Sequence, residues 1–593
     1  MGNSHSSKQT HAQQQRTLIR QRSAPAFSRI SLGCTSGNDS VLSSDPSRES
    51  FSLVNEKVAW RDREKLLLDR GDQPARHHLT PSPQIHYSLA YAPITEFPQG
   101  DTSPAYHDFI RAYPEYQLTW ILDTLRRTDY SRLERTGETY VDYMGGALYP
   151  ESLIRVHTTF LNQHILGNTH SVSNSSQLSA SCAAEAREAV LAFFRAPPEY
   201  TVVFTANATA ALKLIGEAYP FANGSSYVLG ADSHNSVHGI REYASNRGAR
   251  ICYIPSTQTG GFDAPTAKHI LLRNRPRSRD AAPCLFAMTG QSNISNAKNP
   301  LSTLEYAQSL GYHTLLDAAA LAPTSVFSLA ETPVDAMAVS FYKMFGFPTG
   351  VGALVVKKTF LEKLQRPWFA GGNVDVVQVP GTIVTRSHEL YERFEDGTIN
   401  YLTLPAVVDG LRFLSAYLPF LPLRLSSLLH YLTSRLSQLR HDTTGTPVVR
   451  ILSRLPVRRP KSVGEQADCG SIVSLIFLTP SGDMLPNSFI EYAASKESVS
   501  LRTGCMCNPG GAAAILDIED DMKQLYPGVT LKDFEHVVGR ELGVVRISMG
   551  LASNFQDVEK VLQFASSVGT EKTRQVLWTR WTEASGTSVG QAL

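Results

Sequence analysis

The chain contains 593 residues, of which 42% are hydrophobic and 19% charged, so it is long enough to bury more than one hydrophobic core. Its 56 basic and 54 acidic residues leave a net charge of +2, which provides no long-range attraction to nucleic acid, and we expect no such partner. The seven cysteines are odd in number and scattered, which favours a reducing compartment, so we expect a cytoplasmic protein.

Residues 1–95 are polar, rich in Ser, Gln and Arg, and lack a periodic apolar pattern, so we expect a largely disordered tail. The first six residues, Met-Gly-Asn-Ser-His-Ser, fit the acceptor pattern for N-myristoylation at Gly2. One acyl chain together with the basic residues that follow would give weak, reversible membrane contact. The alternative is a solvated tail whose second residue happens to be glycine, because the pattern is short.

Short β-rich runs alternate with helical stretches between residues 201 and 356. This alternation predicts an α/β fold with a mostly parallel sheet, helices on both faces and reactive groups at the strand ends. The predicted strands are Tyr200–Thr205, Ser226–Gly230, Arg250–Ile254, Pro283–Met288, His313–Ala318, Asp335–Phe341 and Gly352–Val356. Farther along, charged residues and prolines interrupt the most apolar region, residues 402–432, which indicates packed helices rather than a membrane span.

A candidate phosphate site follows the first predicted strand. Ala208 and Thr209 lie in a run of small residues that turns into a helix, and free backbone amides at a helix N-terminus attract an anion. Together with Ser340 they would bind a phosphate, although ordinary strand-to-helix chemistry explains the same residues. His234 follows the second strand, where it could stack on an aromatic cofactor or belong to a helix cap.

Two charged residues end later strands. Asp317 could pair with a pyridinium nitrogen and let the ring accept electrons, or it could cap a helix. Lys343 lies at the mouth of a buried strand, where a lysine loses its proton readily and can attack an aldehyde to form a Schiff base. The alternative, more common for a lone lysine, is an ordinary side chain that extends from the strand end to solvent. Because phosphate turn, histidine, aspartate and lysine occur in this order, each after a predicted strand, we expect pyridoxal 5'-phosphate as the cofactor.

The second chemical constellation is the run 502–510, Arg-Thr-Gly-Cys-Met-Cys-Asn-Pro-Gly. Its glycines and proline, without a helical period, predict a mobile loop, which suits a thiol that carries sulfur from a bound substrate to a distant acceptor. Cys505 and Cys507 would also suit zinc, but no second Cys or His pair at zinc spacing occurs, so we expect no metal. Without the lysine constellation, two semi-buried thiols would be the simpler interpretation.

Together these motifs resemble the class V (NifS-like) aminotransferase superfamily, and more narrowly the cysteine desulfurase domain of molybdenum cofactor sulfurases. The resemblance spans roughly residues 100–570. The segments that carry it are Tyr140–Asp142, Leu148–Pro150, Gly167–Ser171, Phe204–Leu214, Gln291–Asn293, Leu315–Ala320, Ser340–Gly346 and Leu501–Pro509.

The resemblance implies fold type I of the transferases that depend on pyridoxal phosphate (PLP), with a large cofactor-binding domain and a smaller α+β domain. The implied parts are the tail (1–95), the first part of the small domain (96–165), the large domain (166–404), the rest of the small domain with the cysteine loop (405–570) and a C-terminal tail (571–593).

The resemblance also assigns roles to single residues. It places Asn293 near the ring and the substrate, and Tyr342 beside the phosphate. In NifS-like desulfurases the acceptor thiol lies five residues after an arginine that holds the substrate carboxylate, and here that spacing joins Arg502 to Cys507. Thr398 would reach the phosphate in a partner subunit, so we expect a homodimer, although by composition its segment is equally well a plain glycine turn.

The chain departs from the family pattern in several places. Residues 143–146 read Tyr-Met-Gly-Gly where sulfurases usually have His-Ala-Gly, Ala320 replaces a glutamine that many NifS-like enzymes use near the ring hydroxyl, and Asn296 replaces a glycine. After the predicted helix that ends near residue 568, only about 25 residues remain, too few for the C-terminal cofactor-binding (MOSC) domain of full sulfurases. We therefore expect a separate sulfur acceptor, either a protein or a cofactor.

Three functions remain open. The first and favoured one is a PLP-dependent cysteine desulfurase, in which Lys343 takes the Cα proton of L-cysteine and Cys507 attacks the sulfur, giving L-alanine and an enzyme persulfide. The second is a PLP-dependent lyase or tailoring enzyme that acts on another amino acid while Cys507 is idle. The third is a non-catalytic binding protein that has kept the fold.

Overall fold

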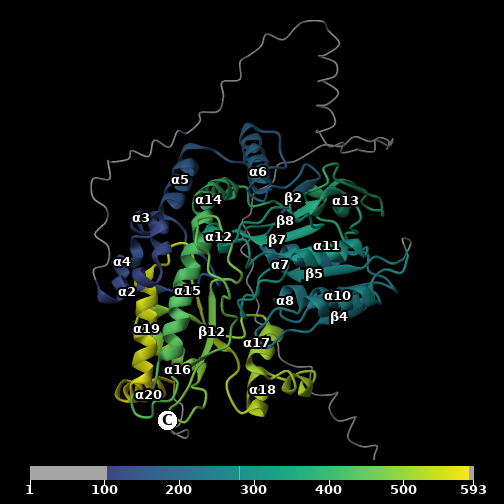
Figure 1. Cartoon of the computed structure of the whole chain (residues 1–593). Coiled ribbons are helices and arrows are strands. Elements are labelled where there is room, and N and C mark those ends of the chain that lie inside the picture. Colours follow the sequence, from purple (N-terminus) through teal and green to yellow (C-terminus); the bar gives the residue numbers. More distant parts are fainter. Residues whose placement is uncertain (1–102, 279–280, 586–593) are drawn as a thin grey trace, which may run out of the picture. The chain divides into compact units, whose positions relative to one another are not determined.

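The structure is a computed structural model that describes residues 103–278 and 281–585 (Figure 1). The disorder expected for residues 1–95 and the acylation expected at Gly2 lie outside the described residues. The α-helices are α2 (Pro104–Ala112), α3 (Trp120–Asp129), α4 (Arg132–Thr136), α5 (Glu151–Gln163), α6 (Asn174–Phe193), α7 (Ala208–Ala218), α8 (Asn235–His238), α9 (Ile240–Asn246), α10 (Ala264–Asn274), α11 (Ser302–Ser309), α12 (Phe341–Phe345), α13 (Lys358–Leu361), α14 (Leu404–Tyr417), α15 (Leu421–Gln438), α16 (Asn487–Lys496), α17 (Pro509–Leu516), α18 (Leu531–Val538), α19 (Phe555–Gly569) and α20 (Glu571–Ser585).

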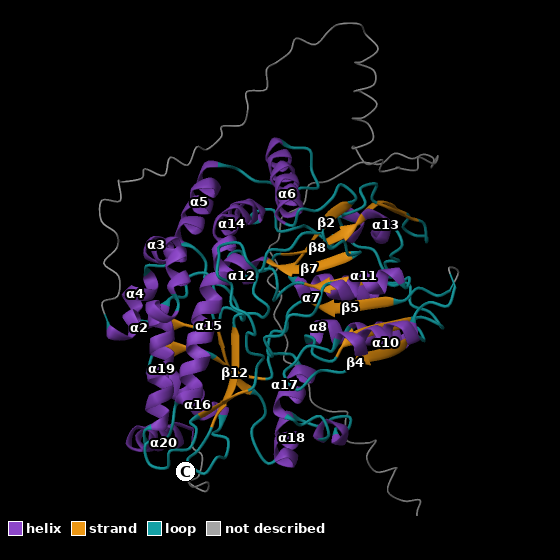
Figure 2. Cartoon of the chain, viewed as in Figure 1, coloured by secondary structure: helices purple, strands orange, loops and turns teal. Residues whose placement is uncertain are grey.

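A seven-stranded sheet with the order β2-β8-β7-β6-β5-β3-β4 forms the larger layer (Figure 2). Its strands are β2 (Tyr200–Thr205), β3 (Ser226–Gly230), β4 (Arg250–Ile254), β5 (Leu285–Thr289), β6 (His313–Asp317), β7 (Ala336–Ser340) and β8 (Gly352–Lys357). In this sheet β8 runs antiparallel to both of its neighbours, and every other pair is parallel. All seven predicted strands are thereby confirmed, with small differences at their ends.

Alternate residues of these strands face two different layers of helices. In β2, Val202 belongs to the hydrophobic cluster that contains residues of α6, α10 and α11, whereas Val203 belongs to the cluster that contains residues of α7 and α9. Successive side chains of a strand point to opposite faces, so a sheet covered on both sides needs apolar residues at nearly every position. The near-continuous apolar runs of the sequence meet this need.

A second sheet, with the order β11-β12-β15-β14, is antiparallel throughout. Its strands are β11 (Val449–Ile451), β12 (Ile472–Phe477), β14 (Arg502–Gly504) and β15 (Val544–Ser548). Beside it, β1 (Thr139–Tyr140) pairs in parallel with β13 (Val499–Ser500), and Asp142 forms a bridge with Ser548. Early and late segments of the chain therefore meet here, while the predicted domain bounds stay a prediction.

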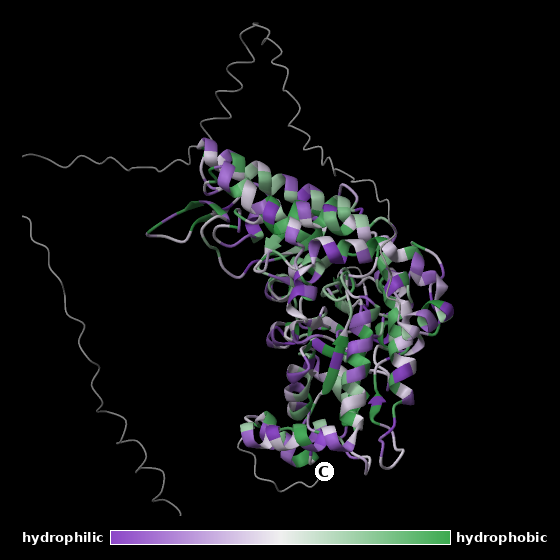
Figure 3. Cartoon of the chain, turned by 90° about the vertical axis from the view of Figure 1, so that its left-hand side faces the viewer, coloured by the Kyte–Doolittle hydropathy of each residue, from purple (hydrophilic) through white to green (hydrophobic). Residues whose placement is uncertain are grey.

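The stretch Leu404–Gln438, which contains α14 and α15, is long and apolar enough to cross a membrane by length and composition alone. Half of its most apolar window is buried inside the protein, and Leu414 and Leu428 are completely buried in the larger hydrophobic cluster. The helices in Figure 3 show hydrophilic and hydrophobic residues along the same helix, as expected for helices that cover a core.

Residues 571–585, within the segment that we predicted as a C-terminal tail, form helix α20. In α20 the side chain of Leu577 is buried, and Trp578 and Trp581 pack against Phe489 of α16, with ring centroids 5.1 and 5.7 Å apart. Aromatic packing of this kind buries large apolar area, and it requires α16, which lies far away in the sequence.

The cysteine loop is shorter than we predicted. Irregular chain is confined to residues 505–508, because Pro509 opens α17. Proline suits the first helical position, where its missing N–H is not needed, and the Asn508 side chain caps the helix by accepting a hydrogen bond from the Gly511 amide at 2.9 Å.

Candidate active site

Parallel strands of the large sheet end beside a cavity of about 130 Å³. Such strands share one carboxyl edge, where loops and helix starts bring side chains from distant parts of the chain together. Eight of the nine residues predicted to hold the cofactor line this cavity: Ala208, Thr209, His234, Asn293, Asp317, Ser340, Tyr342 and Lys343. The ninth, Thr398, lies elsewhere.

The start of α7 forms one end of the cavity. The Ala208 amide donates to Ser340 Oγ at 2.8 Å, and Thr209 Oγ1 lies 2.7 Å from Ser236 Oγ. Asn207 caps the helix through Oδ1, which accepts from the Ala210 amide at 3.0 Å. Hydroxyl groups and the positive end of a helix dipole therefore meet at one point, an arrangement that suits a phosphate. Ser236 was not predicted from the sequence.

His234 lies at the start of α8 and lines the cavity. Its Nδ1 accepts a hydrogen bond from the Ser236 amide at 3.1 Å, so the residue also caps the helix, and both of the roles we considered are compatible with this position. Burial lowers the pKa of His234, although the nearby Asp317 opposes this shift. The ring is therefore neutral at neutral pH, and a neutral ring can stack on an aromatic group.

Asp317 ends β6 with its side chain buried. Its Oδ1 accepts from the Ala319 amide at 3.0 Å, while Oδ2 makes no hydrogen bond with any residue that the structure describes. Because Asp317 lines the cavity, this oxygen is available to a donor bound there, such as a protonated ring nitrogen.

Lys343 lies in α12, immediately after β7. Its amine makes no hydrogen bond or ion pair within residues 103–278 and 281–585. Burial lowers the pKa of Lys343; Asp317 opposes this shift, whereas Arg546 and Arg502 add to it. An amine with a lowered pKa is more often neutral and hence nucleophilic.

Gln291 is a cavity residue to which we assigned no role from the sequence, although it begins the segment Gln291–Asn293 that carries the resemblance. Its side chain is only 1% exposed, and neither amide atom has a hydrogen-bond partner among the described residues. Because buried amides are nearly always paired, these two amide atoms are available to a water molecule or to a polar ligand group in the cavity.

The turn 505–508 carries the two cysteines. The Cys507 thiol is exposed, whereas Cys505 is half-buried and burial raises its pKa. Cys507 is close enough to Lys343 and Arg502 that a thiolate there would raise the pKa of both. The more reactive thiol is therefore the one near the candidate lysine.

Arg502, the predicted carboxylate-binding residue, is half-exposed and bound to Asp142. Its Nη2 and Nε donate to Asp142 Oδ2 at 2.6 and 2.9 Å, while its Nη1 makes no hydrogen bond with any described residue. A second arginine, Arg546, is buried and donates to Asp142 Oδ1 at 2.6 Å. Two arginines and one aspartate leave one positive charge for a carboxylate. The sequence assigned no role to Arg546, nor to Asp142, although Asp142 ends a segment that carries the resemblance.

The family model for class-V aminotransferases ("Aminotransferase class-V") matches residues 139–449. The chain belongs to this family. Molybdenum cofactor sulfurases are similar to it: the protein from Arabidopsis thaliana is 32% identical over 481 residues, covering 75% of this chain and 58% of that protein. The protein from Bos taurus is 33% identical over 468 residues, covering 75% and 51%. The chain thus spans about half the length of the curated relatives it matches, and the resemblance inferred from the motifs is confirmed.

Solved structures confirm the fold of this class-V member. A cysteine desulfurase from Thermococcus onnurineus superposes with a TM-score of 0.58 at 21% identity, covering 75% of this chain and 97% of that one. A C-DES variant with glycine covalently linked to its PLP cofactor superposes with a TM-score of 0.54 at 17% identity, covering 74% and 98%. The fold-type-I α/β prediction is therefore confirmed.

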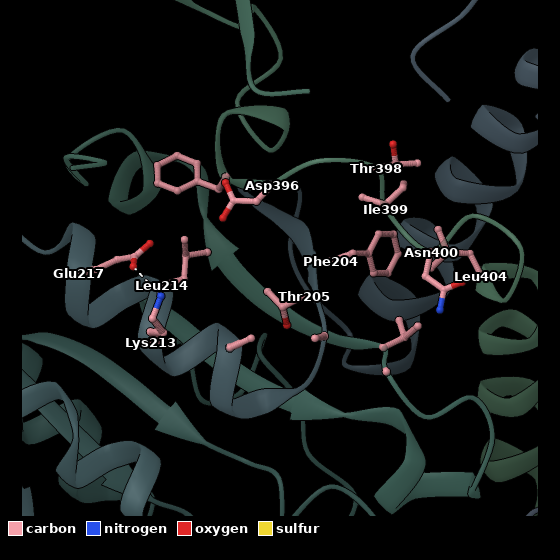
Figure 4. Close-up of a pocket in the computed structure, with 15 residues that line it drawn as sticks. Phe204, Thr205, Lys213, Leu214, Glu217, Asp396, Thr398, Ile399, Asn400 and Leu404 are labelled. Atoms are coloured by element: carbon pink, nitrogen blue, oxygen red, sulfur yellow. Dashed lines mark hydrogen bonds and ion pairs between the residues drawn. The ribbon is translucent and has the colours of Figure 1, made fainter. Parts of the chain in front are cut away.

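Thr398 lines a different, larger cavity of about 360 Å³ (Figure 4). Its Oγ1 accepts a hydrogen bond from Asn168 Nδ2 at 3.1 Å. Within one chain of this class-V member, Thr398 therefore does not join the other eight residues. Among the described residues, no group of three or more His, Cys, Asp or Glu side chains is placed to hold a metal ion.

Proposed function

We propose that the chain is a PLP-dependent cysteine desulfurase that converts L-cysteine to L-alanine and leaves a persulfide on Cys507. The observation that carries this proposal is the position of an exposed cysteine thiol beside an unpaired lysine amine with a lowered pKa, at the edge of a class-V cofactor cavity.

The lining residues fit PLP. Lys343 would hold it covalently, Ala208, Thr209 and Ser340 would bind the phosphate with Tyr342 nearby, and Asp317 Oδ2 would accept from the ring nitrogen. His234 would lie against the ring. The two unpaired amide atoms of Gln291 would form hydrogen bonds with polar substituents of the ring. When bound, PLP supplies an electron sink that stabilises negative charge at the substrate Cα.

The other steps belong to the chain's own residues. Arg502 Nη1 would bind the substrate carboxylate, and the neutral Lys343 amine would take the Cα proton. The Cys507 thiolate would then attack the substrate sulfur, forming an S–S bond as the substrate C–S bond breaks. The three-carbon product gains a proton and leaves as alanine. Cysteine plus thiol gives alanine plus persulfide, so no external oxidant is needed.

The test is to incubate purified protein, PLP and L-cysteine, and to measure alanine and Cys507-bound sulfane sulfur together. Both should appear in equal amounts in the first turnover. The variant Lys343→Ala should lose the visible absorbance of the bound cofactor as well as both products. Turnover of another amino acid that Cys507→Ala leaves unchanged would contradict the proposal and favour a lyase or tailoring enzyme. Unaltered absorbance in Lys343→Ala would favour a non-catalytic protein.

A separate molecule would receive the sulfur, and a second copy of the chain would complete the cofactor site. The acceptor is proposed because the Cys507 thiol faces solvent. Two observations support the homodimer. Thr398 lies outside the cavity of its own chain, so it would have to serve a second copy. The hairpin of β9 (Val374–Val377) and β10 (Val384–Arg386) also presents apolar side chains to solvent, because Val379 and Ile383 are 84% and 62% exposed. Light scattering that gave a monomer mass for the holoprotein would contradict the dimer.

The cytoplasmic location and the acyl chain on Gly2 remain proposals from the sequence alone. They rest on the scattered cysteines and on the short N-terminal acceptor pattern. Mass spectrometry of the mature N-terminus tests the acylation, and a free Gly2 amine or a retained Met1 would contradict it.

A further inference from the structure

The turn that presents the candidate nucleophile has an unusual backbone. Met506 and Cys507 have φ angles of +56° and +54°, so two successive residues other than glycine adopt the left-handed conformation. Side chains with a Cβ atom rarely adopt this region, and such strain persists only where surrounding contacts hold the chain in place.

Three hydrogen bonds hold this turn. Inside it, the Asn508 amide donates to the Cys505 carbonyl at 2.9 Å. From segments that follow strands of the large sheet, the Asn235 amide of α8 donates to the Cys507 carbonyl at 2.7 Å, and Asn293 Nδ2, after β5, donates to the Met506 carbonyl at 2.7 Å. Both left-handed residues are therefore held by segments that also line the cofactor cavity, because Asn235 follows His234 directly and Asn293 is a lining residue.

A buried carboxylate organises these contacts. Asp232 is 3% exposed and forms no ion pair with any described residue. Its Oδ2 accepts from the Gly261 amide at 2.8 Å and from Ser295 Oγ at 2.6 Å; its Oδ1 accepts from Ser292 Oγ at 2.6 Å and from Asn508 Nδ2 at 2.7 Å. Four donors thus replace water around the charge, and one of them belongs to the cysteine turn.

Asn508 connects this carboxylate to the turn. Its Nδ2 is shared between Asp232 Oδ1 and Asn293 Oδ1, at 2.7 and 3.0 Å. The packing is tight as well: a Cβ atom on Gly510 would collide with the Ala231 carbonyl, and one on Gly511 would collide with Asp232 Oδ1. The first turn of α17 therefore lies directly against residues 231–232.

We propose that Asp232 is a positioning residue for Cys507, which acts through Asn508 and Asn293. It holds the turn 505–508 in its left-handed conformation, so that the Cys507 thiol stays exposed near Lys343 while Cys505 stays half-buried. This inference rests on the proposed function only in taking the Cys507 thiol as the nucleophile that receives sulfur. The geometry of the turn can be tested without turnover.

The experiment compares Asp232→Asn, Asn508→Asp and the double variant as full-length holoproteins. Asn508→Asp keeps an acceptor for the Gly511 amide, but removes the shared donor and opposes Asp232 with a second carboxylate. The double variant exchanges donor and acceptor. The control is Asp335→Asn, because this half-buried carboxylate, directly before β7, accepts from the Thr314 amide at 2.7 Å and is not a lining residue of the cavity.

Three quantities are measured. The first is the ratio of the iodoacetamide labelling rates of Cys507 and Cys505, determined by peptide mass spectrometry. The second is the amount of sulfane sulfur on Cys507 after one turnover with L-cysteine. The third is the absorbance of bound PLP. We expect each single variant to lower the labelling ratio and the sulfur loading about tenfold, the effect of one hydrogen bond to a charged group, with the absorbance retained. The double variant should recover part of both losses, because coupled residues have non-additive effects. The control should match the unaltered protein.

An unchanged labelling ratio in both single variants would overturn the proposal, as would a double variant worse than either one. Loss of PLP absorbance in the single variants would assign Asp232 to the general fold instead. If the unaltered protein formed no persulfide, the proposed function would fail, yet the labelling ratios would still decide whether Asp232 positions the thiol.

Discussion

Arg502 and Asp142 form a bidentate ion pair, in which Nη2 and Nε of the arginine donate to Oδ2 of the aspartate at 2.6 and 2.9 Å. The same aspartate binds the buried Arg546, whose pKa burial lowers while Asp142 opposes the shift. Asp142 thus orients the exposed arginine and satisfies the buried one, so the proposed carboxylate site and the stability depend on one side chain.

Asp142→Asn should impair both functions. The buried Arg546 would lose its charged partner, and an uncompensated buried charge destabilises a protein by about 3 kcal/mol. Denaturant unfolding should show this loss, and steady-state kinetics should show a raised KM because Arg502 is no longer held. The matched control is Asp108→Asn at the exposed pair with Arg111, which should change the stability by less than about 0.5 kcal/mol. Equal effects of the two variants would contradict the role of Asp142.

Gly145→Ala should disrupt the same ion pair without altering any charge. A Cβ atom at this position would collide with Asp142 Oδ2 and Arg502 Nη2, whereas at Gly146 it would only touch the Tyr342 ring at 3.6 Å. We expect Gly145→Ala to raise the KM for cysteine about tenfold while the PLP absorbance stays the same, as for the loss of one charge-assisted hydrogen bond. Gly146→Ala is the control. A KM that rises equally in both variants would show that the segment 143–146, not the ion pair, determines binding.

Cys507→Ser and Cys505→Ser should differ sharply. The exposed thiol at 507 is the proposed nucleophile, and burial raises the pKa of the Cys505 thiol, so less of it is thiolate at neutral pH. Protein-bound sulfane sulfur should therefore disappear in Cys507→Ser and persist in Cys505→Ser. If both variants lost it, Cys505 would take part in the transfer.

Gln291→Met should have opposite effects on the apo- and the holoprotein. The substitution removes a buried amide that has no partner among the described residues, so the apoprotein should unfold at a higher temperature. PLP would lose a hydrogen-bond partner, and its dissociation constant, measured by absorbance titration, should rise about fivefold to tenfold. A PLP affinity equal to that of the unaltered protein would show that Gln291 does not contact the cofactor.

The stability of the apoprotein should rise with pH through the window between the lowered pKa of Lys343 and its usual value of 10.5. In that window the unfolded chain binds a proton at this lysine and the folded chain does not, so a higher pH favours the folded state. Lys343→Met removes the group and should flatten this part of the curve. Denaturant unfolding at a series of pH values measures the slope, and equal slopes for both proteins would contradict a lowered pKa.

The large sheet was predictable because its signals are local. Each buried strand is a short apolar run followed by small or polar residues, and parallel strands bring their ends together, so Ala208, His234, Asp317 and Lys343 could be assigned to one site before any contact was known. Thr398 could not be joined to them within one chain.

The residues that the sequence did not reveal act through partners far along the chain. Asp142 forms ion pairs with Arg502 and Arg546, and Asp232 accepts a hydrogen bond from the side chain of Asn508. No local periodicity marks such a pair. The cysteine turn was predicted as a mobile loop for the same reason, because two of the donors that hold it, Asn235 and Asn293, lie far away in the sequence.

The antiparallel strand β8 has a consequence for synthesis on the ribosome. It is the neighbour of β2 in the sheet, so β2 and the candidate phosphate site at the start of α7 lack this support until residues 352–357 have emerged. Ser340, which binds the Ala208 amide, comes only shortly before β8. The cysteine turn emerges much later still. A nascent chain should therefore form the lining of its cofactor cavity before the Cys507 thiol is synthesised, so the reactive thiol is absent while this lining is incomplete.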